Sequence, residues 1–484
     1  MTELRSRVSR GFAWTSGARL FARILDAIVL VILARTLDPV AFGLVATAAA
    51  LIAFAQLLQD MGILQAYVQR PQPAAGDLST LFWGTSLLGA VLSIVLFALA
   101  PSIAAAFGQP ALAPVLATMA PVLFLQATAL APSAELEREL RFGPIALRRT
   151  IGSIAGGLTA IALALAGAGA FALVARVLVD ATVGTVLLWA SVRWMPSLKF
   201  SPRRFWEYAR FGLPVAGARF LETVQSRSDD LLIARFLGPA ALGIYSVAYQ
   251  LFRILVEVIT GSASQVLSPA FARLQHERSR LLSAYYRAVR TTALVTVPIF
   301  AGAAAIAGPL ITLIFGPQWE DAIPVLQVLA ILGIVQSIRY YDAALLIAIG
   351  RPKIGLVVRA ITVTLTVAGY VLAVQFGDLV AFAVAQVIVA IVVSTPIWLA
   401  VLSKTVGVRP LELARRVWSP LTAAAIMFIV VWVTDAGTQL GNALTLLICI
   451  PLGAMTYAAL ILLLDRAAFR ELTDLAKALR GHAG

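Results

Sequence analysis

The chain has 484 residues, of which 60% are hydrophobic and only 13% are charged, and its formal net charge is +14. Soluble domains are about 45–50% apolar and about 25% charged, so this composition excludes a water-soluble globular protein. The positive charge would suggest nucleic acid in a soluble chain, but membrane topology explains its placement better, and we expect no nucleic-acid partner. The single cysteine, Cys449, excludes an internal disulfide.

Apolar stretches follow one another along nearly the whole chain. About 20 consecutive apolar residues are needed to cross the hydrocarbon core of a bilayer. The runs are continuous rather than alternating, which favours helices over a β-barrel. We therefore predict an all-α polytopic membrane protein with about 14 spans, at residues 17–37, 41–67, 78–107, 112–133, 144–168, 170–190, 212–237, 241–267, 291–315, 322–350, 354–376, 379–402, 417–434 and 440–464.

Basic residues gather in every second connection between these spans, and the alternate connections contain no Lys or Arg. Because Lys and Arg collect on the cytoplasmic side of membrane proteins, the basic connections and both termini are expected in the cytoplasm. The basic connections carry Arg70; Arg138, Arg141, Arg148 and Arg149; Arg193, Lys199, Arg203, Arg204 and Arg210; Arg273, Arg278, Arg280, Arg287 and Arg290; Arg351 and Lys353; and Lys404, Arg409, Arg415 and Arg416. Of these, we interpret 273–290 as an amphipathic helix lying on anionic lipid.

An internal repeat appears when the chain is compared with itself at an offset of 200 residues. Ala34, Arg35, Pro39, Ala41 and Gly43 fall on Ala234, Arg235, Pro239, Ala241 and Gly243 without a gap. Six predicted helices separate the copies, so the two halves have the same orientation in the membrane. Parallel repeats are a recurring transporter plan with the substrate site between the halves. The predicted domains are a six-helix bundle at 1–190, a cytoplasmic linker at 191–210, a second bundle at 211–402, and a terminal helix pair with its tail at 403–484.

Ionisable residues inside the spans are the best candidates for function, because each costs about 2.5–3.5 kcal/mol at a helix centre and tends to face a wet cavity. In the first span Arg19, Arg23 and Asp26 share one helical face. The equivalent stripe in the second copy holds Arg219, Glu222, Ser226 and Asp229 or Asp230. Three further pairs have helical spacing, which also fits simple intrahelical ion pairs: Arg176 with Asp180, Arg253 with Glu257, and Arg339 with Asp342.

Residues 34–43, ARTLDPVAFG, resemble the A-R-x-L-G-P-x-x-F-G signature after the first helix of oligosaccharide flippases. These are the Wzx-type members of the multidrug/oligosaccharidyl-lipid/polysaccharide exporter superfamily. Asp38 replaces the usual glycine, whereas Gly238 in the second copy keeps it. The segments 315–319 (FGPQW) and 348–352 (AIGRP) are similar to two further motifs of that family.

This resemblance implies a flippase of the bacterial inner membrane with no cofactor. The implied substrate is an undecaprenyl-pyrophosphate-linked oligosaccharide for lipopolysaccharide or exopolysaccharide, moved by alternating access. Membrane lipids, and the polymerase and chain-length proteins of the pathway, are the implied partners. Planar guanidinium groups bind phosphate oxygens in pairs, so we expect Arg23, Arg219, Arg253 and Arg339 to bind the pyrophosphate. The acids expected to balance charge or relay protons are Asp26, Glu222, Asp229, Asp230, Glu257 and Asp342.

Two other functions fit the composition. A multidrug or cation exporter of the same superfamily would favour acids over arginines in its cavity. A membrane enzyme of polysaccharide assembly would need a large outward loop or a catalytic carboxylate cluster, but the outward connections predicted here are short. His276 and His482 are the only histidines and are far apart in the sequence, and no P-loop or nucleophile motif is present. We therefore predict a transporter rather than an enzyme.

Overall fold

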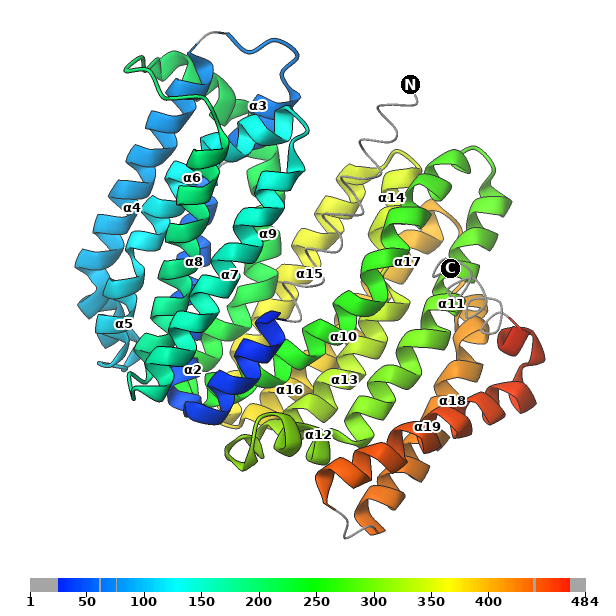
Figure 1. Cartoon of the computed structure of the whole chain (residues 1–484). Helices are drawn as coiled ribbons and strands as arrows, with labels where there is room; N and C mark the ends of the chain where they lie inside the picture. Colours follow the sequence, from blue (N-terminus) through cyan, green and yellow to red (C-terminus); the bar gives the residue numbers. More distant parts are fainter. Residues whose placement is uncertain (1–24, 61, 75, 438–440, 471–484) are drawn as a thin grey trace. The chain divides into compact units, whose positions relative to one another are not determined.

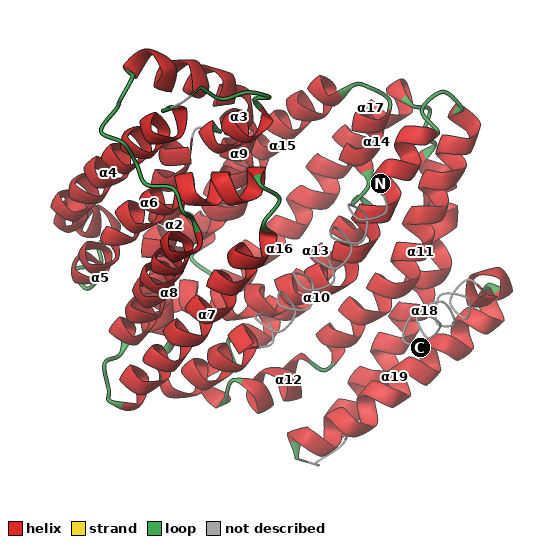
Figure 2. Ribbon diagram, turned by 45° about the horizontal axis from the view of Figure 1, so that its top comes forward, coloured by secondary structure: helices red, strands yellow, loops and turns green. Residues whose placement is uncertain are grey.

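A computed structural model describes residues 25–60, 62–74, 76–437 and 441–470, with the backbone alone for 60, 257–270 and 272. Within these ranges every regular element is a helix and no strand occurs, as Figure 2 shows. The predicted all-α polytopic class is thus confirmed. Of the predicted site residues, Arg23 and the side chain of Glu257 lie outside what the structure describes.

The chain divides into two compact units, and the boundary falls between Gly243 and Ile244. The first unit runs from blue to green in Figure 1. Its helices are residues 25–36, α2 (Pro39–Asp60), α3 (Ile63–Gln69), α4 (Asp77–Phe107), α5 (Leu112–Met119), α6 (Pro121–Arg138), α7 (Phe142–Leu165), α8 (Ala170–Ser191) and α9 (Pro202–Phe236). The boundary lies inside α10 (Gly238–Arg273) because α9 packs with α2, α3 and α4. The predicted division into six-helix bundles stays a prediction.

The second unit continues from α10 to the end of the described chain. Its helices are α11 (Arg278–Ala305), α12 (Ala307–Ile314), α13 (Ala322–Ile338), α14 (Asp342–Ala348), α15 (Pro352–Ala373), α16 (Leu379–Ile388), α17 (Thr395–Thr405), α18 (Pro410–Gly437) and α19 (Asn442–Leu464). A π-helical turn, Val389–Ser394, joins α16 to α17.

Eleven helical stretches among the described residues are long and apolar enough to cross a membrane. The other three predicted spans are 17–37, which is described only from residue 25, and the spans that became α7 and α9. Both of these form as helices, but α9 carries six charged side chains from Arg219 to Arg235 and so has low mean hydropathy. Such a helix is stable in a membrane only when its charges are paired or face a polar cavity.

The repeated Pro and Gly positions lie against each other within the first unit. A methyl group added at Gly43 would lie 1.7 Å from the carbonyl oxygen of Pro239, and one added at Gly243 would lie 1.9 Å from that of Pro39. The repeat therefore marks two reciprocal contacts that only glycine allows.

The single departure from the repeat signature, Asp38, also has a physical reason. Its Oδ1 accepts a 2.8 Å hydrogen bond from the amide of Ala41 and so caps the start of α2. Its counterpart Gly238 has a φ of +88°, a conformation that favours glycine. The two copies thus begin their second helices with different devices.

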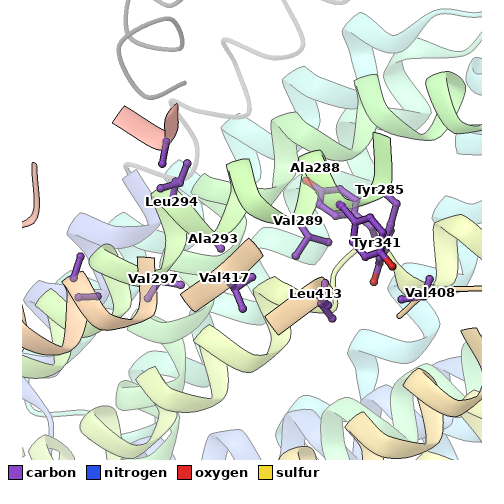
Figure 3. Close-up of a cluster of buried hydrophobic side chains, with 14 of the residues drawn as sticks. Tyr285, Ala288, Val289, Ala293, Leu294, Val297, Tyr341, Val408, Leu413 and Val417 are labelled. Carbon is purple, nitrogen blue, oxygen red and sulfur yellow. The ribbon is translucent and has the colours of Figure 1, made fainter. Parts of the chain in front are cut away.

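The core of the second unit includes the terminal helix pair. Leu294 and Val297 of α11 share one buried cluster with Leu413 and Val417 of α18, as Figure 3 shows. Polar bonds fasten the pair to α11: Arg290 Nη2 lies 2.8 Å from Asp465 Oδ2, and the Tyr457 hydroxyl donates to the carbonyl of Leu294 at 3.0 Å.

The prediction of a surface helix at 273–290 is wrong. Helix α11 runs without a break from Arg278 to Ala305, so its basic start belongs to a spanning helix. Tyr285 is fully buried and Tyr286 is 8% exposed. The basic residues repeat along this segment as they would on a lipid-bound helix, but the two tyrosines face protein.

Gly43→Ala is expected to destabilise the protein by about 1–3 kcal/mol, because the new methyl group overlaps a backbone oxygen that cannot rotate away. Gly184→Ala in α8 is the matched control, since nothing lies within 4 Å of its added methyl group. The measurement is thermal unfolding of the purified protein in detergent. Equal melting temperatures for the two variants would contradict the reciprocal contact.

Asp465→Asn should lower the free energy of unfolding by about 2 kcal/mol, because it removes the carboxylate that faces the mostly buried Arg290 and accepts from Ser419. Glu412→Gln removes the carboxylate of a more exposed pair, Glu412 with Arg416, and should cost less than about 1 kcal/mol. Thermal unfolding compares the two, and a smaller effect at Asp465 than at Glu412 would show that the terminal pair is not anchored there.

Candidate functional site

A polar cavity of about 430 Å³ lies within the first unit, between α2, α6 and α9. Pockets of roughly 300–1,000 Å³ are typical of small-molecule sites. The cavity is lined by Ala53, Gln56, Leu57, Gln59, Gly62, Gln126, Leu130, Ala216, Arg219, Thr223, Ser226 and Arg227. We call it the polar cavity.

One face of α9 provides the cations and hydroxyls of the polar cavity. Arg219, Thr223 and Ser226 are spaced by four and three residues, which places them on one side of a helix. The predicted α9 stripe is therefore real for Arg219 and Ser226. Glu222 belongs to the exposed surface and is not among the lining residues, because it lies three positions from Arg219 but on the flank of that face.

Charge balance at the cavity comes from acids next to its wall. Arg227 Nη1 lies 3.0 Å from Asp230 Oδ2, and Asp229 Oδ1 accepts from the amide of Asp230 at 3.0 Å. Both acids are buried, at 5% and 8% exposed. Among the described lining residues there are two guanidinium groups and no carboxylate, so the wall favours an anion.

Three amide side chains complete the cavity, and sequence reasoning missed all of them. Gln56 donates to Gln126 across α2 and α6, and Gln59 Nε2 donates to the carbonyl of Leu123 at 3.0 Å. Gln59 is 3% exposed, and its Oε1 has no hydrogen-bond partner among the described residues. Gln56 and Gln59 lie three positions apart in an apolar span, and this spacing was the signal in the sequence. The prediction was based on charged side chains and did not include them.

Predicted residues of the second unit are engaged elsewhere. Arg339 lies 3.4 Å from Asp342 Oδ2, donates to Thr395 at 3.3 Å, and stacks over Trp398 at 5.9 Å. The buried Asp342 also accepts from the Tyr285 hydroxyl at 2.8 Å. The ion pair suggested by spacing is thus formed, but it spans the turn between α13 and α14 rather than lying inside one helix.

Two other predicted pairings differ from their spacing. Arg253 is exposed and donates to Gln250 at 2.6 Å, and the side chain of its predicted partner is not described. Arg176 pairs with Asp26 at 2.6 Å rather than with Asp180, and Ser153 donates to the same Asp26 oxygen at 2.6 Å. Asp26 therefore joins the first helix to α7 and α8, a contact between segments that helix spacing cannot reveal.

The chemistry of the polar cavity suits a ligand with both phosphate and hydroxyl groups. Guanidinium groups donate charge-assisted hydrogen bonds to phosphate oxygens. Amides and hydroxyls donate and accept, as recognition of sugar hydroxyls requires. Among the described residues, no group of three or more His, Cys, Asp or Glu is arranged to hold a metal ion.

Several known proteins match most of this chain. Residues 32–324 match the family model described as polysaccharide biosynthesis protein. The succinoglycan biosynthesis transport protein ExoT of Rhizobium meliloti is 28% identical over 98% of this chain and 97% of its own. Teichuronic acid biosynthesis protein TuaB of Bacillus subtilis is 28% identical over 81% and 82%, and lipopolysaccharide biosynthesis protein WzxC of Escherichia coli is 28% identical over 72% of each chain.

Solved structures share the fold at low sequence identity. The lipid II flippase MurJ, in an inward closed conformation, matches with a TM-score of 0.75 at 14% identity, over 94% of this chain and 99% of its own. An inward-facing multidrug transporter of the MATE family matches with a TM-score of 0.59 at 16% identity, over 79% and 95%. The family model and the relatives named above confirm the predicted resemblance to Wzx-type proteins of polysaccharide biosynthesis, and the two solved structures show a shared fold.

Gln59→Met should leave the free energy of unfolding within about 1 kcal/mol of the native value, because it removes one hydrogen bond and also one buried acceptor without a partner. Gln126→Met removes the acceptor of Gln56 without relieving any such group, and should destabilise by about 1 kcal/mol or more. Thermal unfolding measures which of the two variants is less stable. If Gln59→Met is the more destabilising, its Oε1 has a partner that keeps the site structural.

Proposed function

Because this chain belongs to the polysaccharide biosynthesis protein family, we propose that it is a flippase for lipid-linked oligosaccharides. The chain is a multi-pass membrane protein, and its family and relatives make it a transporter rather than an enzyme. The proposed substrate is an undecaprenyl-pyrophosphate-linked repeat unit, which it moves from the cytoplasmic to the periplasmic leaflet of a bacterial inner membrane. The polar cavity is the single observation that carries this proposal.

The cavity supplies what a pyrophosphate requires in a bilayer. A charged head enters an apolar medium only where countercharge and hydrogen-bond donors replace its water. Arg219 and Arg227 line the cavity, and Asp230 is close enough to Arg227 to balance its charge before the ligand arrives. Exchange of that carboxylate for a phosphate would leave the guanidinium paired in both states.

The remaining lining groups fit the sugar that follows the pyrophosphate. Gln56, Gln59 and Gln126 bring amide groups to the lining, and amides both donate and accept hydrogen bonds as sugar hydroxyls do. Thr223 and Ser226 add hydroxyls on the same wall. A cationic drug would find no lining carboxylate among the described residues, which argues against the exporter alternative.

The remaining predicted roles belong to the same proposal. We place the termini in the cytoplasm on the alternation of basic connections. Arg23, Arg253 and Arg339 stay candidates for pyrophosphate contact, although Arg339 already has Asp342 as a partner. Asp26, which bridges Arg176 and Ser153, is the acid best placed in the first unit to change partners when an ion binds. Partners among polymerase and chain-length proteins stay predictions.

The test is translocation of a fluorescent polyprenyl-pyrophosphate oligosaccharide by the purified protein in vesicles, with and without a pH gradient or a membrane potential. Arg219→Gln should slow translocation by at least about tenfold, the worth of a charge-assisted hydrogen bond to phosphate. Arg280→Gln is the matched control, because this exposed arginine pairs with Glu277 in the second unit and is not among the residues that line the polar cavity.

If both variants translocate the oligosaccharide at the native rate, the polar cavity is not part of the substrate path. If the protein translocates a cationic dye but does not translocate the oligosaccharide, it is a cation exporter rather than a flippase. A loss of translocation by Arg219→Gln alone, at unchanged protein yield and melting temperature, is the expected result.

A further inference from the structure

A second cavity of about 370 Å³ lies in the first unit near the ends of α3 and α9. It is lined by Ala66, Gln69, Arg70, Pro71, Glu207, Tyr208 and Phe211. We call it the α3–α9 cavity. Sequence reasoning used Arg70 only as a marker of topology.

Arg70 is the cation of this cavity, and its guanidinium is not held in a short ion pair with any described residue. The Arg70 side chain is 44% exposed, its guanidinium stacks 5.1 Å from the centre of the Tyr208 ring, and Asp77 is 3.9 Å away. Asp77 itself is saturated by closer partners, since it accepts from Arg204 at 2.9 Å, from Tyr208 at 2.7 Å and from the amide of Ala74 at 2.8 Å. The short hydrogen bonds of Asp77 therefore come from residues other than Arg70.

The loop that carries Arg70 is pinned from both sides. Arg138 donates to the carbonyl oxygens of Arg70 and Pro71 at 3.3 and 3.1 Å, and Asp77 holds the amide of Ala74. Among the described lining residues Glu207 is the one acid, and Arg203 lies 3.5 Å from it. The cavity thus presents a preorganised guanidinium whose neighbouring acids are already paired.

Part of the wall beside this cation is apolar, which points to an amphiphile. Phe211 is 60% exposed and lines the cavity with Ala66 and Pro71. The neighbouring Trp206 is 64% exposed, as is common for tryptophan where membrane meets water. Helix α3 lies between two candidate spans, of which one ends at Gln59 and the next begins at Asp77. On this basis we place the cavity at headgroup level.

The two cavities lie along the same two helices. Gly62 lines the polar cavity, and Ala66 and Gln69 of the following α3 line the α3–α9 cavity. On α9, Phe211 faces one cavity and Ala216 the other, a rise of about 7.5 Å in a helix. Between them Gly62, at φ +68°, packs against Gly212 so closely that an added methyl group would lie 2.5 Å from its carbonyl oxygen. Because Gly62 and Gly212 are both glycines, this contact places no side chain between the two cavities.

We propose that the α3–α9 cavity binds the phosphate headgroup of a lipid at the membrane surface, with Arg70 on the phosphate and Phe211 against the adjoining chain. Because it lies next to the polar cavity on α3 and α9, it is a loading site where the head of the lipid waits before it reaches Arg219. The loading role rests on the proposed flippase function, whereas the binding site itself does not.

The experiment uses the full chain in vesicles with a photoreactive short-chain prenyl pyrophosphate, and mass spectrometry locates the labelled residues. Labelling is expected at 66–71 and 207–211. Arg70→Gln should reduce it about tenfold, the worth of one charge-assisted hydrogen bond, and Arg280→Gln should not. Phe211→Glu, at an exposed position, is the second variant if Arg70→Gln fails to fold, and it should also abolish labelling because it places a carboxylate beside the phosphate.

Competitors separate the sources of the phosphate. If phosphatidylglycerol displaces the label, the site binds a bulk anionic lipid. If phosphatidylglycerol does not displace it, the site selects the prenyl pyrophosphate. Both outcomes support a site for a lipid headgroup. Displacement by inorganic pyrophosphate at the same concentration as the prenyl compound would overturn the lipid assignment. Unchanged labelling in Arg70→Gln and Phe211→Glu would overturn the site. Arg219→Gln should still be labelled here, so a protein that is labelled but does not translocate would refute the flippase alone.

Discussion

The constraint on which this structure depends is the placement of guanidinium groups inside a membrane. An arginine in a span is tolerated only where a carboxylate, a polar wall or the membrane surface receives its charge. Helix α9 meets this requirement by holding Arg227 against Asp230 while the same face carries Arg219 into the polar cavity. The helix is stable in the bundle because its polar stripe lies against α2 and α6, whose glutamines continue the polar surface.

The same constraint is met differently in the second unit. Arg339 is held by Asp342, Thr395 and the ring of Trp398, and the buried Tyr285 hydroxyl takes the other oxygen of Asp342. Such a closed network fixes the position of α14 against α11 and α17. Loss of one member of a buried ion pair leaves an uncompensated charge, so a network of this kind resists change. The two units therefore carry similar sequence signals with different structural outcomes, one open to a cavity and one closed on itself.

Glycine contacts position the helices that carry these charges. Gly43 and Gly243 allow the backbones of α2 and α10 to meet at the repeated prolines, and Gly62 allows the turn before α3 to meet α9. These approaches bring α2 and α3 close enough to α9 for short polar side chains to share a cavity. A side chain at any of these three positions would separate the helices.

The sequence by itself determined the class of the protein, its spans and its repeat, because hydropathy, the charge of connections and ungapped repetition are properties of the chain alone. It also marked Arg219, Ser226 and the Arg339–Asp342 pair, since helical spacing is local. Only the tertiary structure decided that Asp26 joins Arg176, that Gln56, Gln59 and Gln126 line the polar cavity, and that residues 278–290 are the start of α11. The reason is that pairing across helices depends on how close their backbones come, and those distances are set by packing between segments far apart in the sequence, 150 residues in the case of Asp26 and Arg176.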